Sequence, residues 1–212
     1  MEYLDIYDEN GTFLGSEDRK IVHEKALWHN TIHCWLYDKD GNVYFQIRKD
    51  KGTLYTTASG HVQAGETIKE AFGREIKEEI GYQINYEKAQ KIEVVKYILD
   101  REEEDGSIFK DRAFANIYAC LFEGSLEELD FQESEIKGIV KLNAQDVLQV
   151  ITNEEGTINC EESYKENGKV IVSTSIKKFS DFLVNKGETA LEKYGNVIKF
   201  IINETQKSRI FL

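Results

Sequence analysis

The sequence predicts an α/β fold in which a mixed β-sheet carries helices on its faces. Runs of β-branched and aromatic residues are separated by Asn-Gly and Asp-Gly pairs that suit tight turns. One amphipathic helical segment lies between two groups of these runs. The 212 residues, of which 41% are hydrophobic, are enough for one substantial core. We therefore expect a single domain over residues 1–212.

Two strand pairs precede the helix. Residues 3–7 and 12–15 flank an Asn-Gly turn and form an N-terminal β-hairpin. Residues 31–37 and 43–48 flank a second turn that ends in Asp-Gly. Both pairs supply strands to the sheet before the helix begins.

The helix is predicted over residues 68–80, and Gly81 is expected to end it. Its apolar side chains recur at every fourth position and form one stripe that suits packing on a core: Ile68, Phe72, Ile76 and Ile80.

Two longer strands are predicted after the helix, at residues 91–99 and 112–122. The acidic stretch between them, residues 100–106, is interpreted as a hairpin loop. A short strand at residues 136–142 and a helix at residues 144–151 complete the main part of the domain. We place its core at about residues 28–152.

Residues 153–212 are expected to form a C-terminal extension with a hairpin and helices. The hairpin turns at Asn167-Gly168. Helices are predicted for residues 175–184 and 188–206, the second with amphipathic spacing. We expect this last helix to pack on the sheet; a homodimer contact or a lid over a pocket are the alternatives.

The composition argues against several classes of partner. A formal net charge of −12 disfavours duplex nucleic acid and anionic membranes, because binding to either needs clustered Lys and Arg. The N-terminus lacks the pattern of a targeting signal, and no run approaches about 18 apolar residues. Cys34, Cys120 and Cys160 lack metal-binding spacing and indicate free thiols in a reducing compartment. A cytoplasmic protein is expected, and intact duplex nucleic acid is not an expected partner.

Three carboxylates, Glu75, Glu78 and Glu79, lie along one edge of the apolar stripe. They repel one another by a few tenths of a kcal/mol per pair in water, and by more when partly buried. A divalent cation would turn this repulsion into ligation, and hard oxygen ligands suit Mg²⁺ or Mn²⁺. For the helix taken alone, a solvated acidic face is the simpler interpretation.

The wider spacing favours the metal site. From Gly60 to Tyr82 the chain reads G-x5-E-x7-R-E-U-x-E-E-x-G-U, where U is a bulky apolar residue. This pattern resembles the Nudix box, the signature of the Nudix hydrolase superfamily. Seven fixed residue types match by chance at roughly 10⁻⁸ per starting position. Tyr82 departs from the pattern, since an aliphatic residue is usual there, but the position is one of packing.

The resemblance implies an α/β/α sandwich around a mixed sheet, with the box as a loop, a helix and a second loop. Within the superfamily, residues 3–122 look most like the isopentenyl-diphosphate isomerase branch, through YDENGTFLG, IHCWLYDKDGNVYFQIRK and ASGHVQAGE. The likeness is thin after residue 150.

The resemblance also implies a Mg²⁺-dependent pyrophosphohydrolase of a nucleoside diphosphate derivative or a related small molecule, in which water attacks phosphorus. The metal ligands that it implies are Glu75, Glu78, Glu79 and a backbone carbonyl of Ser59 or Gly60.

Arg74 would brace the carboxylates through charge-assisted hydrogen bonds. Glu66 would tie the loop near the helix start, where an acid also suits the helix dipole. Gly65 and Gly81 have structural places in the box. The catalytic set is then Glu75, Arg74 and Glu78.

The general base is left open, because members of the superfamily place it differently. Glu75 is favoured here, since exposed acidic loops are usually just solvated. The alternatives are Glu103 or Glu104 in the acidic stretch, and Glu133 or Glu135 before the next strand.

Arg48 is the candidate for holding substrate phosphate, because its guanidinium is a planar fork and Gln46 lies on the same strand face. Lys49 or Lys51 lies nearby. A surface ion pair is the simpler interpretation of Arg48. Four aromatic residues are candidates for stacking on a base, although each is more simply a core residue: Trp28, Trp35, Tyr55 and Phe114.

The histidines keep an isomerase interpretation open. In the isomerases, three histidines at places similar to His23, His29 and His61 form a metal site with two glutamates. A structural hydrogen-bonding role is the simpler interpretation of each histidine.

Two departures count against isomerisation. The position of the isomerase's catalytic cysteine is Ser59 here, and its glutamate pair aligns near Lys110 and Arg112. Hydrolysis is therefore favoured. A non-catalytic Nudix ligand-binding module is the third alternative, and the intact box carboxylates argue against it.

Overall fold

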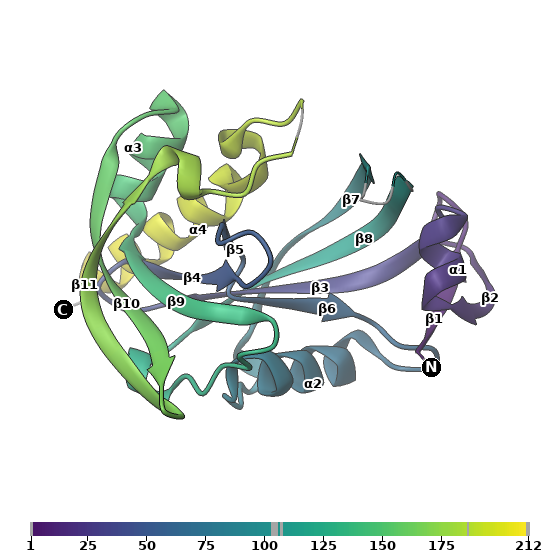
Figure 1. Ribbon diagram of the computed structural model, residues 1–212, viewed down its shortest axis with the longest axis horizontal. Helices are drawn as coiled ribbons and strands as arrows, with labels where there is room; N and C mark the ends of the chain where they lie inside the picture. Colours follow the sequence, from purple (N-terminus) through teal and green to yellow (C-terminus); the bar gives the residue numbers. More distant parts are fainter. Residues whose placement is uncertain (1, 103–105, 107, 186, 211–212) are drawn as a thin grey trace.

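The computed structural model describes residues 2–102, 106, 108–185 and 187–210, which form a large mixed sheet with helices on both faces (Figure 1). The box helix α2 lies on one face, and α3 and α4 lie on the other. The predicted sandwich with an N-terminal β-hairpin is therefore confirmed.

The strands, in chain order, are β1 (Tyr3–Tyr7), β2 (Phe13–Asp18), β3 (Trp28–Tyr37), β4 (Asn42–Arg48), β5 (Leu54–Tyr55), β6 (Ala58–His61), β7 (Gln90–Glu102), β8 (Ile108–Leu121), β9 (Ile136–Asn143), β10 (Thr157–Glu166) and β11 (Lys169–Lys178). The helices are α1 (Arg19–Glu24), α2 (Ile68–Ile80), α3 (Ala144–Asn153) and α4 (Ala190–Ile210), with 3-10 turns η1 (Tyr86–Lys88), η2 (Leu126–Glu128) and η3 (Phe179–Asp181).

The central strand is β3. It pairs in parallel with β8 and antiparallel with β1, β4 and β6, so the sheet is mixed. The register places Ser59 of β6 opposite His33, and Gly60 opposite Ile32. The loop that begins the box is thereby held against the middle of the sheet.

Local signals fix α2 where the sequence predicts it. Thr67 caps its N-terminus in a capping box: the Thr67 hydroxyl accepts from the Glu70 backbone N–H, and the Thr67 backbone N–H donates to the Glu70 carboxylate. Gly81 ends the helix with φ of 65°, and a Cβ there would meet the Asp130 carbonyl oxygen at 2.7 Å. Phe72, Ile76 and Ile80 of the apolar stripe are buried, whereas Glu75 and Glu78 at its edge keep part of their surface accessible.

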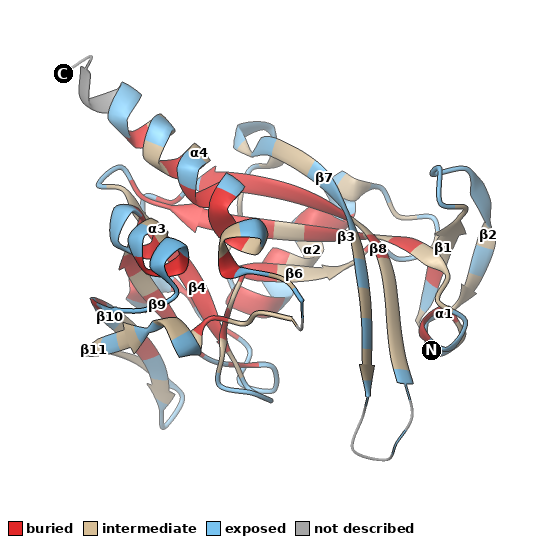
Figure 2. Ribbon diagram, turned by 90° about the horizontal axis from the view of Figure 1, so that it is seen from above, coloured by how far each residue is buried: buried red, intermediate tan, exposed pale blue. Residues whose placement is uncertain are grey.

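Two clusters of apolar side chains, one on each face, make up most of the core. Figure 2 shows buried residues concentrated along β3 and β4 and on the sheet-facing side of α4. Tyr194 of α4 meets Trp35 of β3 edge to face, with ring centroids 5.8 Å apart. The last helix therefore packs on the sheet, as expected, while the homodimer stays a prediction.

Two secondary-structure predictions are wrong. Residues 175–184 are not helical: β11 continues to Lys178 because its backbone pairs with β10, and η3 follows. The acidic stretch 100–106 is largely strand in its described part, since β7 continues to Glu102 and Asp100 faces Lys110 of β8. The predicted turn at Asn167-Gly168 is confirmed, with φ of 52° and 75°.

Apart from the 3-10 turns, three elements were not predicted. They are the short helix α1 and the short strands β5 and β6. Each has only two to six residues, which is too few to show a hydrophobic period in the sequence. No helix in the described part of the chain is both long and apolar enough to cross a membrane.

Candidate active site

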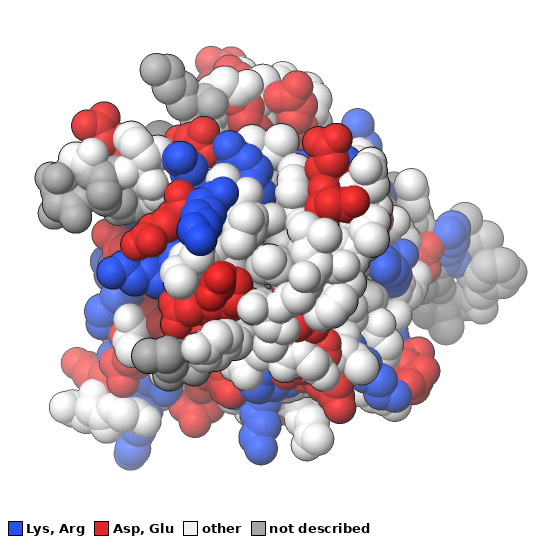
Figure 3. Space-filling view, turned by 90° about the vertical axis from the view of Figure 1, so that its right-hand side faces the viewer, with Lys and Arg blue, Asp and Glu red and all other residues white. Residues whose placement is uncertain are grey.

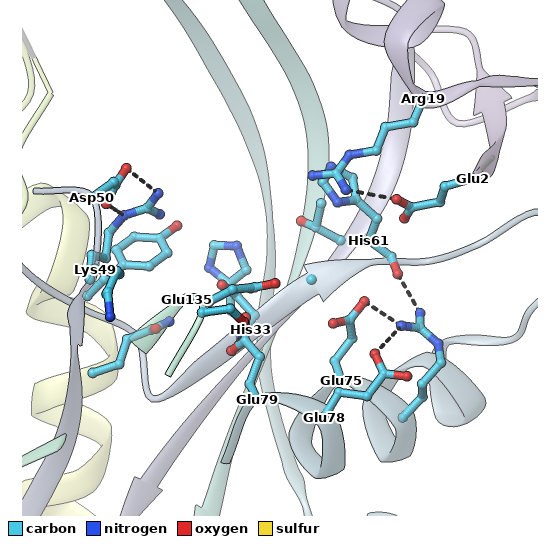
Figure 4. A pocket seen from close by; sticks show the side chains of 18 of the residues that line it. Glu2, Arg19, His33, Lys49, Asp50, His61, Glu75, Glu78, Glu79 and Glu135 are labelled. Atoms are coloured by element: carbon cyan, nitrogen blue, oxygen red, sulfur yellow. Dashed lines mark hydrogen bonds and ion pairs between the residues drawn. The ribbon is translucent and has the colours of Figure 1, made fainter. Parts of the chain in front are cut away.

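A cavity of about 640 Å³ opens beside the acidic edge of α2. Figure 4 shows Glu75, Glu78 and Glu79 extending from α2 between Lys49 and Asp50 at one end and Arg19 and Glu2 at the other. Most residues predicted for the site line it: Gln46, Arg48, Ser59, Gly60, Arg74, Glu75, Glu78 and Glu79. Lys51 is exposed, and the lining lysine of this segment is Lys49.

The surface on the right-hand side of Figure 1 carries charges of both signs. Figure 3 shows Lys and Arg side chains beside Asp and Glu side chains on one half of this face, next to a broader uncharged area.

Glu79 is the most buried of the three box carboxylates, with 7% of the residue exposed. Its Oε2 accepts a hydrogen bond from the Ser59 backbone N–H at 2.9 Å. Burial raises the pKa of Glu79 to about 8 although this hydrogen bond lowers it, and the nearby Glu75 raises it further. The negative charge of an ionised Glu79 side chain is therefore poorly compensated by its surroundings.

Glu75 lies beside Glu79, and Arg74 braces it. Burial raises the pKa of Glu75 to about 7, against the effect of Arg74 Nη1 at 2.7 Å. Arg74 Nε and Nη2 donate to the two oxygens of Glu66 at 2.9 and 2.8 Å, and Nη2 also donates to the His61 carbonyl oxygen at 2.9 Å. Glu78, whose side chain is 55% exposed, lies 3.3 Å from Arg74 Nη1. One guanidinium therefore ties the helix to the box loop.

Gly60 allows the backbone to approach the carboxylates closely. A Cβ at this position would overlap the Glu75 carboxylate. Gly65 has φ of 76°, a conformation that favours glycine, and its N–H donates to Asp5 Oδ2 at 3.0 Å. The two glycines therefore serve different purposes, one steric and one conformational.

Arg48 lines the cavity and is also engaged in an ion pair. Its Nε and Nη2 donate to the two Asp50 oxygens at 3.0 and 2.9 Å. Gln46, on the same face of β4, is 5% exposed. Arg48 therefore forms an ion pair and also lies at the cavity, although these were alternative interpretations of the sequence.

The remaining predicted residues separate into cavity and non-cavity positions. Glu135 lines the cavity, whereas Glu133 is exposed and does not contribute to it. Glu103 and Glu104 lie outside the described residues.

Among the four aromatic candidates, Tyr55 lines the cavity. Trp35 is buried in the core, and Trp28 stacks on Phe114 with ring centroids 4.9 Å apart.

His23, His29 and His61 come together at the edge of the cavity, where one ring nitrogen from each lies within 4.8 Å of the others. Nδ1 of His23 and of His29 lies 3.1 Å from a backbone carbonyl. The Nε2 atoms of these two rings have no hydrogen-bond partner among the described residues. Burial lowers the pKa of all three rings, which favours the neutral form that binds metals.

Asp111 is a site residue that sequence reasoning missed. It lines the cavity, and its Oδ1 lies 3.5 Å from His29 Nε2. Burial raises the pKa of its carboxyl group. The alternation along β8 could have found it, because Asp111 is in phase with the buried Ala113 and Ala115.

His33, Arg19 and Glu2 also line the cavity without having been predicted. Arg19 Nη1 lies 2.8 Å from Glu2 Oε2, and both come from the N-terminal segment. No sequence signal places that segment beside a helix that starts at residue 68.

Comparisons with known proteins agree with this geometry. The NUDIX domain family model matches residues 27–158. An uncharacterized Nudix hydrolase of Clostridium acetobutylicum is 29% identical over 204 residues, which cover 92% of each chain. An isopentenyl-diphosphate Delta-isomerase of Serratia proteamaculans is 24% identical over 128 residues, 58% of this chain and 68% of that one.

A crystal structure of a Deinococcus radiodurans protein has a similar fold, with a TM-score of 0.53 and 20% identity over 72% of this chain and 90% of that chain. The family model matches more than half of the chain, and the residues that carry the box pattern meet at one cavity. The chain belongs to the Nudix family.

Proposed function

We propose that the chain is a Mg²⁺- or Mn²⁺-dependent pyrophosphohydrolase that cleaves a diphosphate linkage in a nucleoside diphosphate derivative or a related small molecule. The supporting observation is that the half-buried Glu75 and the buried Glu79 line one cavity, with pKa values raised by burial to about 7 and about 8. A divalent cation fits this donor set, because it would compensate both carboxylates when they are ionised.

The proposed metal ligands are Glu75, Glu78, Glu79 and a backbone carbonyl of Ser59 or Gly60. A metal bound there would neutralise phosphate charge and lower the pKa of the attacking water. Arg74 would keep the carboxylates in place, since it contacts two of them and the box loop at once.

Arg48 and Gln46 are proposed to hold phosphate oxygens at the other end of the cavity. Asp50 takes up Nε and Nη2 of Arg48, and no hydrogen bond from Nη1 is seen to the described residues. A phosphate oxygen can therefore bind Nη1 while Asp50 keeps the fork in place. Of the two lysines, Lys49 is the better-placed neighbour, because it lines the cavity and Lys51 does not.

Glu75 is proposed as the general base. Its carboxylate lines the cavity next to the other proposed metal ligands, where the attacking water would bind. Glu135 is the second candidate, because it lines the same cavity.

The test is a screen of nucleotide, sugar-nucleotide, coenzyme and prenyl diphosphates with Mg²⁺, following phosphate release. The variant Glu78→Gln with Glu79→Gln is expected to lose all Mg²⁺-dependent release while keeping its fold. Glu133→Gln, an exposed acid outside the cavity, is the matched control and should retain full activity. Retained hydrolysis in the double variant would contradict the metal assignment.

A second candidate function is isopentenyl-diphosphate isomerisation. The cluster of His23, His29 and His61 with Asp111 favours it, since neutral imidazoles and a carboxylate suit a transition-metal ion. Ser59 at the place of the isomerase cysteine opposes it. Following double-bond migration separately from phosphate release decides between the two, and migration without release would favour the isomerase.

The setting proposed for either activity is the cytoplasm. The structure has free, buried thiols at Cys34, Cys120 and Cys160, which support a reducing compartment.

A further inference from the structure

Tyr55 is a cavity residue that the proposed diphosphate chemistry does not use. It lies on β5, which has only two residues and pairs with β4 through Gln46 and Ile47. So short a strand gives its side chains little intrinsic rigidity. The position of the Tyr55 ring must therefore depend on contacts from elsewhere in the chain.

The C-terminal segment supplies the backbone contacts. The Leu183 N–H donates to the Leu54 carbonyl oxygen at 3.0 Å. The Tyr194 hydroxyl lies 2.6 Å from the Leu183 carbonyl oxygen and 3.3 Å from that of Leu54. Figure 1 shows α4 close to β5. The main chain beside Tyr55 is thus fastened to α4 and to the residues before it.

Lys193 of α4 supplies the side-chain contact. Its ammonium nitrogen lies 5.4 Å from the ring centroid of Tyr55 and 5.9 Å from that of Tyr97, a distance at which cations and rings attract. Only 8% of the Lys193 side chain is exposed. Glu188 lies 3.4 Å from the ammonium, and Asn185 donates to both Glu188 and the Tyr97 hydroxyl at 2.9 Å.

A lysine buried among aromatic rings with one carboxylate is costly if it serves packing alone. Burial lowers the pKa of Lys193, which measures part of that cost. An apolar side chain of the same length would fill the same space. Unlike an apolar side chain, the ammonium group attracts the Tyr55 ring through its positive charge.

Two cavity residues, Arg48 and His33, also contact the Tyr55 ring. The Arg48 guanidinium carbon lies 5.8 Å from the centroid of the Tyr55 ring, and the His33 ring meets that ring at 5.8 Å with an interplanar angle of 70°. Both residues line the cavity. The Tyr55 ring thus stands between the phosphate-binding arginine and the C-terminal helix.

We infer that Lys193 is a positioning residue that holds Tyr55 as an aromatic wall of the cavity, so that the C-terminal helix selects substrates with a planar ring next to the phosphate. The inference rests on the proposed function for the place of the phosphate. It assigns the extension a part in recognition: a base stacks on Tyr55, while Arg48 binds the adjoining phosphate.

The test compares two ligands that differ only in the base, AMP and ribose 5-phosphate, by calorimetric binding with Mg²⁺. The wild-type protein should bind AMP more tightly by about tenfold or more, as expected for one stacked base. Lys193→Met should reduce this ratio by about fivefold with an unchanged Kd for ribose 5-phosphate, and Lys193→Arg should restore it.

A merely structural lysine would weaken both ligands equally in Lys193→Met, and that result overturns the inference. So does a wild-type protein that shows no preference for AMP or binds neither ligand. Tyr55→Leu must abolish the preference whether or not Lys193→Met folds, and a retained preference contradicts the stacking role. These binding measurements do not depend on catalysis. They therefore test the role of Lys193 and Tyr55 even if the protein does not hydrolyse diphosphates.

Discussion

Glu79→Gln should make the metal-free protein more stable at alkaline pH. Folding raises the pKa of Glu79 from its usual 4.5 to about 8, so the folded state holds its proton more tightly than the unfolded state. The stability that this proton contributes is present below pH 4.5 and is lost as the pH rises toward 8. At about 1.4 kcal/mol per pKa unit, the ionised side chain costs the metal-free fold about 5 kcal/mol.

The glutamine variant has no carboxylate to ionise, and its side-chain carbonyl can still accept the hydrogen bond from Ser59. Urea unfolding in EDTA at pH 5 and pH 8.5 measures the effect. Between the two pH values the wild-type protein should lose about 3–4 kcal/mol more than the variant, because Glu75, whose pKa is raised to about 7, titrates in both proteins. Adding Mg²⁺ at pH 8.5 should restore the wild type alone.

Glu133→Gln, at an exposed position, is the control and should follow the wild type. Equal pH slopes for the wild type and Glu79→Gln would refute the reasoning, because they would mean that the buried carboxylate is already compensated without a metal.

Three further changes test separate parts of the site. Gly60→Ala should lower Mg²⁺-dependent hydrolysis at least about tenfold because its Cβ overlaps Glu75, whereas Gly73→Ala, with open space around its Cβ, should not. Gly81→Ala should destabilise the protein by about 1–3 kcal/mol in urea unfolding, because φ is 65° and the Asp130 carbonyl is in contact. His61→Ala should remove a bound transition metal from the purified protein in elemental analysis, and His33→Ala, outside the histidine cluster, should not.

The parts of the fold that were predicted correctly have signals that act over a few residues. The helix α2 was placed to the residue from its apolar stripe and its terminal glycine, and the capping box seen in the structure agrees with the predicted start. The hairpins were found because glycine marks each turn. The lining of the cavity by box residues also follows from one helix and the loop before it.

The wrong predictions fall where pairing with a distant segment of the chain determines the secondary structure. Residues 175–184 carry Ile176, Phe179 and Leu183 at helical spacing, but the backbone of this stretch pairs with β10 up to Lys178. Propensity is a weak signal against a ladder of hydrogen bonds to a neighbouring strand.

The histidine cluster illustrates the same limit for the site. His23, His29 and His61 are individually uninformative, and Asp111 was passed over between two basic residues. Only the parallel pairing of β3 with β8 brings Asp111 to His29. A pattern in one sequence does not specify such a register.

That parallel pair also sets the order in which the protein can assemble. Residues 29–37 of β3 must meet residues 113–121 of β8, and the whole of the box lies in the loop that this contact closes. Loop-closure entropy opposes the step until many contacts form together, whereas α2 can form locally. During refolding, helical signal should therefore precede the joining of β3 to β8.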